Sequence, residues 1–257
     1  MSKQGKPVWY ELTTTDFEAA RSFYSKVLGW SVADSGMAGF DYQIASADDA
    51  MVAGMMKPPH PEVPPNWGIY FAVDDCDATA KAAEASGGRI CAGPTDIPQV
   101  GRFAALSDPQ GAMFCILKGE GADSQAFDQS KMGHGNWHEL MSPDPKAGLS
   151  FYSDLFGWKA STSMDMGAMG TYQLFSHDGK DIGGMMGQGN SPVPCWLPYF
   201  GANGVGAAIE RIRSAGGSIV HGPMEVPGGA WIVVAHSATG RADPANAQAV
   251  LPVPAWA

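Results

Sequence analysis

The stretch that decides the fold runs from Trp9 to Trp30 and reads WYELTTTDFEAARSFYSKVLGW. A second copy, WHELMSPDPKAGLSFYSDLFGW, runs from Trp137 to Trp158 at a constant offset of 128 positions. The copies agree at Trp, Glu-Leu, Asp, Ala, Ser-Phe-Tyr-Ser and Gly-Trp without a gap. This agreement indicates a tandem duplication, and it divides a chain of 257 residues into two domains of roughly 120 residues each.

The repeated stretch predicts a strand followed by a helix. In the opening strand, alternation places Tyr10 and Leu12 on one face. Trp9 and Glu11 fall on the opposite face, and the second copy alternates in the same way. Asp16 precedes a helical run, where its carboxylate can accept hydrogen bonds from the first turn. We therefore expect the helix to cover the Tyr10 side of a sheet, with Trp9 and Glu11 facing away from the helix.

The order strand, helix and three further strands occurs twice in each half. A proline-rich loop ends the first unit, because consecutive prolines cannot stay within a sheet ladder. The second unit is predicted as a strand at 67–73, a helix at 74–86 and strands at 89–92, 102–107 and 112–117. The second half repeats this order, but its last strand matches poorly. Pairing Asp243-Pro244 with the Asp108-Pro109 turn of the first half requires an insertion.

These units predict an α+β fold of two tandem domains, each built from paired βαβββ modules. We place the first domain at residues 5–120 and the second at residues 132–257. Residues 121–131, which are polar and rich in small side chains, are predicted to link them.

Charge and composition limit the partners. The formal net charge is −10, and 16 basic residues scattered among 26 acidic ones offer no basic stripe for nucleic acid or an anionic membrane. The four cysteines have no C-x-x-C spacing and do not look like a disulfide framework. The N-terminal residues lack the apolar segment of a signal peptide, and no apolar run approaches ~18 residues. We expect a cytoplasmic protein, monomeric or homodimeric, whose partner is a small molecule.

The W-x-E-L opening, the F-Y-x-x-x-x-G-W helix end and the D-P-Q-G turn resemble the vicinal oxygen chelate superfamily. This superfamily includes glyoxalase I, extradiol dioxygenases and bleomycin-resistance proteins, and the chain looks most like its tandem glyoxalase-like branch, which includes proteins labelled as hydroxylases. The resemblance covers essentially the whole chain. It implies that each pair of modules forms a cupped mixed sheet whose concave side holds the site.

The resemblance also implies a divalent metal, held by His, Glu or Gln on the first and last strands of the modules. Indole and aliphatic side chains cannot supply such donors. We therefore expect no metal at the usual position in either half. The positions that match the family's ligands are Trp9, Trp137, Trp67 or Gly68, Trp196 or Leu197, Cys115 and the region of Val250.

Glu11 and Glu139 are the candidate catalytic residues, because each shares a strand face with a tryptophan two positions earlier. Indole walls can raise the pKa of a carboxyl group, which then serves as an acid or base. The alternative is a structural salt bridge or backbone hydrogen bond. The candidate substrate-binding residues are four tryptophans that open strands and two glutamines that follow tyrosines: Trp9, Trp67, Trp137, Trp196, Gln43 and Gln173. Each tryptophan can instead pack in a core, and each glutamine can be solvated at a sheet edge.

Three functions fit these observations. The first is a glyoxalase-like lyase, or a related activity, on a small electrophile such as a methylglyoxal–thiol adduct. The second is a metal-free binding protein of the bleomycin-resistance type, favoured by the loss of metal donors and the gain of indoles. The third is a structural or partner-binding role. The first two place a small molecule in the cup of each domain.

Overall fold

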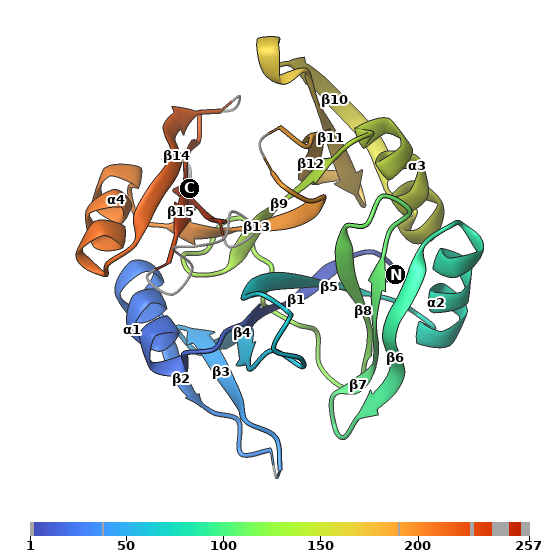
Figure 1. Cartoon of the computed structure of the whole chain (residues 1–257), viewed down its shortest axis with the longest axis horizontal. Helices are drawn as coiled ribbons and strands as arrows, with labels where there is room; N and C mark the ends of the chain where they lie inside the picture. Colours follow the sequence, from blue (N-terminus) through green and yellow to red (C-terminus); the bar gives the residue numbers. More distant parts are fainter. Residues whose placement is uncertain (1–2, 38, 190, 227–228, 238–246, 253–257) are drawn as a thin grey trace. The chain divides into compact units, whose positions relative to one another are not determined.

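The computed structural model describes residues 3–37, 39–189, 191–226, 229–237 and 247–252. Its elements follow the predicted order of strand, helix and three strands, four times in succession (Figure 1). The first half contains β1 (Pro7–Thr13), α1 (Phe17–Leu28), β2 (Ser31–Asp34), β3 (Tyr42–Ala47), β4 (Ala50–Met56), β5 (Asn66–Ala72), α2 (Cys76–Ala85), β6 (Arg89–Ile97), β7 (Gly101–Ser107) and β8 (Met113–Gly119).

The second half repeats these elements. It contains β9 (Gly135–Ser142), α3 (Pro145–Phe156), β10 (Lys159–Asp165), the short 3-10 helix η1 (Gly167–Met169), β11 (Thr171–His177), β12 (Lys180–Gly187), β13 (Cys195–Ala202), α4 (Val205–Ser214), β14 (Ser218–Glu225), β15 (Trp231–His236) and β16 (Ala247–Pro252). The poorly matching last strand is therefore present, paired with β13 in parallel and with β15 antiparallel. The Asp243-Pro244 match lies outside the described residues.

Hydrogen bonding places β1–β8 in one eight-stranded sheet and β9–β16 in another. Within the first module, the strand order is β2-β3-β4-β1, with β1 parallel to β4 and the other pairs antiparallel. The corresponding module of the second half has the order β10-β11-β12-β9, with the same parallel pair between β12 and β9. The predicted α+β fold of mixed, open sheets built from βαβββ modules is confirmed.

The described chain forms two compact units, each of which takes one module from each half. Unit 1 comprises Met1–Val8, Gly68–Asp123 and His138–Trp196. Unit 2 comprises Trp9–Trp67, Ser124–Trp137 and Leu197–Ala257. The sequence boundaries at 5–120, 121–131 and 132–257 stay a prediction.

The helix ends follow from local sequence. At α1, a side-chain oxygen of Asp16 accepts a hydrogen bond from the Ala19 backbone N–H at 2.9 Å. Gly29 then ends the helix in the left-handed region, with φ of 77°, which glycine adopts at little cost. At α3, Asp144 caps the first turn in the same way, and Pro145 occupies the first helical position, where its missing donor costs nothing.

The F-Y-x-x-x-x-G-W segment that ends each repeated stretch contributes to an aromatic core in each unit. In unit 2, Tyr24 and Trp30 stack with ring centroids 5.3 Å apart, and Trp67 donates its indole N–H to the Tyr24 hydroxyl at 3.2 Å. In unit 1, Tyr152 stacks on Trp158 at 5.6 Å, and Trp196 donates to the Tyr152 hydroxyl at 2.9 Å. Aromatic pairs of this kind stabilise by about 0.5–1.5 kcal/mol beyond the area that they bury. The Phe-Tyr pair and the final Trp of the motif are therefore core residues, whereas the glycine before that Trp is exposed at the helix end.

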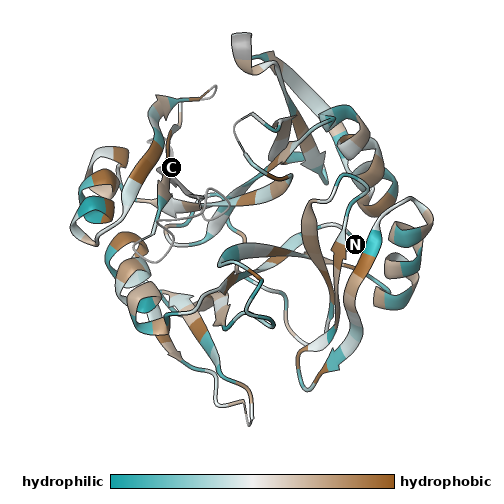
Figure 2. Cartoon of the chain, viewed as in Figure 1, coloured by the Kyte–Doolittle hydropathy of each residue, from teal (hydrophilic) through white to brown (hydrophobic). Residues whose placement is uncertain are grey.

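The helices carry both hydrophilic and hydrophobic residues (Figure 2), as expected for helices that cover one side of a sheet. In α1 the buried side chains are Ala20, Phe23, Tyr24 and Val27. In unit 2, α1 also contacts α4, because Arg211 Nε donates to the Val27 carbonyl oxygen at 3.0 Å. No helix in the described part of the chain is long and apolar enough to cross a membrane.

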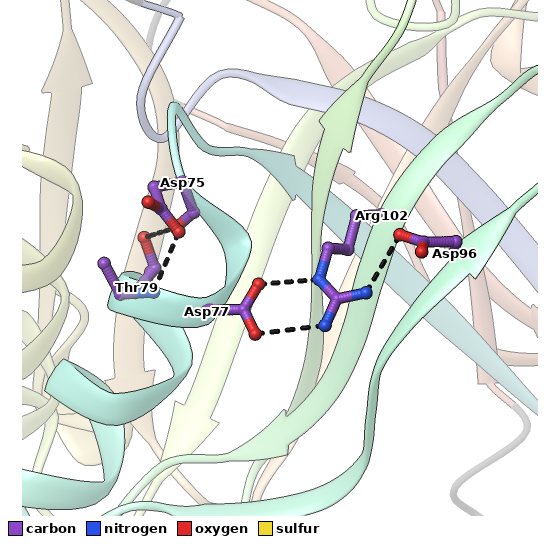
Figure 3. Close-up of polar contacts among 6 residues, drawn as sticks. Asp75, Asp77, Thr79, Asp96 and Arg102 are labelled. Atoms are coloured by element: carbon purple, nitrogen blue, oxygen red, sulfur yellow. Dashed lines mark hydrogen bonds and ion pairs between the residues drawn. The ribbon is translucent and has the colours of Figure 1, made fainter.

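Strand β6 is longer than the sequence pattern predicts. Its pairing with β7 is interrupted between Ala92 and Thr95 and then resumes at Thr95 and Asp96. Arg102 on β7 supports the extension, because its guanidinium donates to Asp96 at 2.9 Å and to both carboxylate oxygens of Asp77 on α2 at 2.6 and 3.0 Å (Figure 3). These hydrogen bonds hold the pKa of Asp77 below its usual value. The arrangement joins α2 to strands β6 and β7 within unit 1.

Candidate functional site

The strand register brings five residues to one face of the first module. Glu11 on β1 is paired with Gly54 on β4, and Gly54 is paired with Ile44 on β3. Directly paired residues point to the same face, and so do residues two apart on one strand. Trp9 and Tyr42 therefore share the face of Glu11. Tyr10 and Leu12 lie on the opposite, buried face, as the sequence predicts.

On this face, the Tyr42 hydroxyl connects Trp9 to Glu11. The Trp9 indole N–H donates to the Tyr42 oxygen at 2.9 Å. The Tyr42 O–H in turn donates to Glu11 Oε2 at 3.0 Å. All three residues are half-buried, and the Tyr42 hydroxyl is hydrogen-bonded to both the Trp9 indole and the Glu11 carboxylate. We call Trp9, Glu11 and Tyr42 the first triad.

Gly54 explains how a tyrosine on β3 reaches a carboxylate on β1. Strand β4 lies between β3 and β1. A Cβ atom added at Gly54 would lie 1.9 Å from the Tyr42 hydroxyl oxygen, far inside any allowed contact. The tyrosine ring therefore lies across β4 at the one position of the strand where no side chain stands in its way.

The second half repeats this arrangement on its own first module. Glu139 on β9 is paired with Gly184 on β12, and Gly184 is paired with Leu174 on β11. A Cβ atom added at Gly184 would lie 2.5 Å from the Tyr172 hydroxyl oxygen, so Tyr172 also lies across its central strand. We call Trp137, Glu139 and Tyr172 the second triad. They lie on the corresponding strands, β9 and β11, on the face of Gly184.

The second triad has a thiol beside it. The charge of Glu139 contributes to a raised pKa of the Cys195 thiol, although burial is the larger cause. Ser191 lies 3.5 Å from the sulfur and opposes the shift. The position that corresponds to Cys195 in the first half is Asn66, which donates to the Pro64 carbonyl oxygen instead. A raised pKa lowers the fraction of thiolate at neutral pH, and the thiolate is the nucleophilic form of cysteine.

The structure places the two predicted glutamines on the other face of their sheets. Gln43 is paired with Met55, and Met55 is paired with the buried Leu12. Gln173 is likewise paired with Met185, which faces Leu140 in the core. The side chain of Gln173 donates to backbone oxygens of residues 161, 162 and 174. Neither glutamine shares the face of Glu11 or Glu139.

Two of the four predicted tryptophans lie in the cores. Trp67 and Trp196 are buried, and each uses its indole N–H to bond a core tyrosine. Trp9 and Trp137 are half-buried and share strands with the candidate glutamates. The structure thus brings together Trp9 with Glu11 in the first half, and it places Trp137 two positions before Glu139 on β9.

Tyr42 and Tyr172 are the residues that sequence reasoning missed. They precede Gln43 and Gln173 in the repeated D-Y-Q-I and T-Y-Q-L segments, so they carry the same repeat signal as the glutamines. The second signal is a glycine inside the next strand, since such a glycine often marks the close approach of another group. Only the register decides that the tyrosine, and not the glutamine, meets the glutamate.

The duplicated βαβββ modules of the two halves have the architecture of a tandem glyoxalase-like protein. The family model of the Glyoxalase/Bleomycin resistance protein/Dioxygenase superfamily matches residues 6–116 and 134–245. The chain belongs to this superfamily.

Relatives and solved structures agree with this assignment. The Mycobacterium tuberculosis protein named "Putative glyoxylase CFP32" is 32% identical over 231 residues, 88% of each chain. The Streptomyces peucetius anthracycline biosynthesis protein DnrV is 30% identical over 245 residues, which are 88% of this chain and 87% of DnrV. The Mn(II)-bound glyoxalase of Novosphingobium aromaticivorans has the same fold, with a TM-score of 0.66, 18% identity and coverage of 98% and 82%. The 2,3-dioxygenase LapB of Pseudomonas sp. KL28 gives a TM-score of 0.69 at 11% identity, with coverage of 98% and 93%.

The tryptophans at the family's metal positions offer no ligand to a divalent ion. Trp9 presents an indole N–H, and that N–H is directed to the Tyr42 oxygen. Trp137 has the same side chain, and Cys115 stands where the resemblance places a glutamate. Within the described ranges, no group of three or more His, Cys, Asp or Glu side chains is arranged to hold a metal.

Proposed function

We propose that each half binds a small molecule at its triad, with a hydrogen-bond donor of the ligand on the glutamate and an apolar part of the ligand against the tryptophan. The observation that carries this proposal is the Tyr42 hydroxyl, which bonds Trp9 and Glu11 at the same time. Such a bridge fixes the orientation of a carboxylate beside an apolar wall. Mostly apolar sites with a few oriented polar groups are typical of small-molecule binding.

The same groups are able to move a proton. Glu11 accepts a proton when it acts as a base. The single Tyr42 O–H donates to Glu11 in this structure, and it can turn to a carbonyl oxygen of the ligand once Glu11 is protonated. A base beside a donor is the arrangement that removes a proton next to a carbonyl group. We therefore propose glyoxalase-like acid–base chemistry as the enzymatic form of this function, supported by the name of the mycobacterial relative.

A metal-free binding protein of the bleomycin-resistance type is the second candidate. It is favoured by the indoles at the metal positions, because an indole offers a large flat surface and no metal ligand. We expect less than one equivalent of Zn, Ni, Mn or Fe per chain by elemental analysis after purification without chelators. One equivalent per half, with loss of activity on its removal, would contradict this expectation.

Isothermal titration of phenol, 2-naphthol and the hemithioacetal of methylglyoxal and glutathione tests the proposal. The double variant Glu11→Gln/Glu139→Gln should bind at least roughly tenfold more weakly, because a hydrogen bond to a charged group contributes about 1.5–3 kcal/mol. The matched control is Glu18→Gln, at an exposed position of α1 outside the triads. Turnover of the hemithioacetal, followed by absorbance, separates the enzyme from the binding protein. Wild-type binding and turnover by the double variant, together with a lower melting temperature, would show that the glutamates are structural.

We also propose that the chain acts in the cytoplasm, as a monomer or homodimer. The four cysteines are free thiols, which are typical of proteins from reducing compartments. Size-exclusion chromatography with light scattering measures the assembly, and a mass corresponding to a trimer or larger would contradict the second part of this proposal.

A further inference from the structure

An exposed aromatic ring, that of Phe40, lies against the first triad. Phe40 lies two residues before Tyr42, next to the start of β3, and 49% of its surface is exposed. Its ring stacks on that of Tyr42, with centroids 5.9 Å apart and planes 26° apart. Phe40 and Tyr42 thus present two nearly parallel rings in succession, of which the second carries the hydroxyl that bonds Glu11.

The position of Phe40 sets it apart from the hydrophobic core. The core side of this module is formed by Tyr10, Leu12 and the buried face of α1, whereas Tyr42 shares the face of Glu11. A ring that stacks on Tyr42 extends that second face. The exposed Phe40 ring adds apolar surface beside the oriented Tyr42 hydroxyl and Glu11 carboxylate, and a mostly apolar surface with a few oriented polar groups is typical of small-molecule sites.

The second half has no ring at the corresponding position. The segments around the two tyrosines align at an offset of 130 positions, which places Gly170 at the position of Phe40. Gly170 has a φ of 80°, a conformation that phenylalanine adopts only with strain, and it ends the short helix η1. The two triads therefore share their polar groups but differ in aromatic surface.

We infer that the first triad takes a flat ligand of two or more fused rings with a phenolic hydroxyl, and that Phe40 determines this specificity. The inference rests on the proposed binding function and names its ligand class. The ligand hydroxyl bonds Glu11, and its rings lie along Tyr42 and Phe40. The second triad, with Gly170 in place of the ring, binds one-ring and two-ring phenols with similar affinity.

Phenol and 2-naphthol distinguish the two triads, because they share the hydroxyl and differ by one fused ring. In isothermal titration, Phe40→Ala should weaken 2-naphthol binding roughly three- to tenfold, the range expected from losing one aromatic contact. Phenol binding should stay within about twofold, since the Glu11 hydrogen bond is kept. Met169→Ala is the matched control, because Met169 is 44% exposed and lies next to Gly170 in the second half.

Single glutamate variants separate failure of this inference from failure of the proposed function. Glu11→Gln should remove the tighter 2-naphthol site, and Glu139→Gln should leave that site intact. If Glu11→Gln weakens both probes while Phe40→Ala changes neither, the triad binds ligands but the specificity assigned to Phe40 is wrong. If neither glutamate variant changes the binding of either probe, the proposed function itself fails. Equal selectivity for 2-naphthol in wild type and Phe40→Ala overturns the inference in either case.

Discussion

The buried histidine of the second repeat predicts a specific loss of stability in acid. His138 occupies the position of Tyr10 in the first repeat and is 0% exposed. Its Nδ1 lies 2.7 Å from the Ile182 carbonyl oxygen, an acceptor, so Nδ1–H is the donor. Its ring lies edge-on to Phe71, with centroids 6.3 Å apart. The native environment thus accommodates a neutral imidazole.

Burial lowers the pKa of His138 from 6.5 to about 4, and the bond to Ile182 opposes this shift only in part. Because the folded pKa is depressed, the native state resists protonation while the unfolded chain accepts it. The stabilisation is therefore fully present above pH 6.5 and is lost as the pH falls towards the folded value near 4. Linkage between these two pKa values gives a loss of about 2 kcal/mol between pH 7 and pH 5, and about 3 kcal/mol by pH 4.

Urea unfolding, followed by tryptophan fluorescence at pH values from 7.5 to 4, gives the free energy of unfolding of the wild type and of a His138 variant. The difference between the two measures the contribution of His138. The perturbation is His138→Gln, which keeps a donor for Ile182 but does not titrate. The variant should be less stable than wild type at pH 7 and should lose this disadvantage in acid, because the other titrating groups are common to both proteins. Parallel stability curves for wild type and variant across this range would refute the reasoning.

The glycine under Tyr42, the cap of α1 and the ion pairs of Arg102 each give a further prediction. Gly54→Ala should displace the Tyr42 ring and weaken phenol binding as Tyr42→Phe does, at a cost of about 1–3 kcal/mol in stability; calorimetry and urea unfolding check this, with Gly187→Ala as the control. Asp16→Ala removes the bond to the first turn of α1 and should lower the free energy of unfolding by about 0.5–2 kcal/mol in urea titrations; an unchanged midpoint would contradict it. Arg102→Ala should lower the melting temperature slightly at low salt and less in 1 M NaCl, because exposed ion pairs are screened; a salt-independent effect would count against this account.

The sequence by itself determined the repeat, the order of the elements and the ends of the helices. These features are local: an Asp before a helical run caps it, a glycine after the run ends it, and a proline cluster interrupts a sheet. Alternation within β1 also predicted that Glu11 lies on the face away from α1, because the period of a strand is two in any register. The buried Tyr10 and Leu12 confirm that prediction.

Only the tertiary structure decided which side chains meet. The register of β3 against β4, and of β4 against β1, places Tyr42 rather than Gln43 beside Glu11. A shift of one residue exchanges the two faces of a strand, and no local signal fixes that shift between strands that are distant in sequence. Trp67 shows the same limit, because its partner Tyr24 is 43 positions away and is reached only when α1 packs on the sheet. Alternation is a property of one strand, whereas several strands together form a site. The sequence therefore predicted the face on which Glu11 lies, but not the side chains that meet it there.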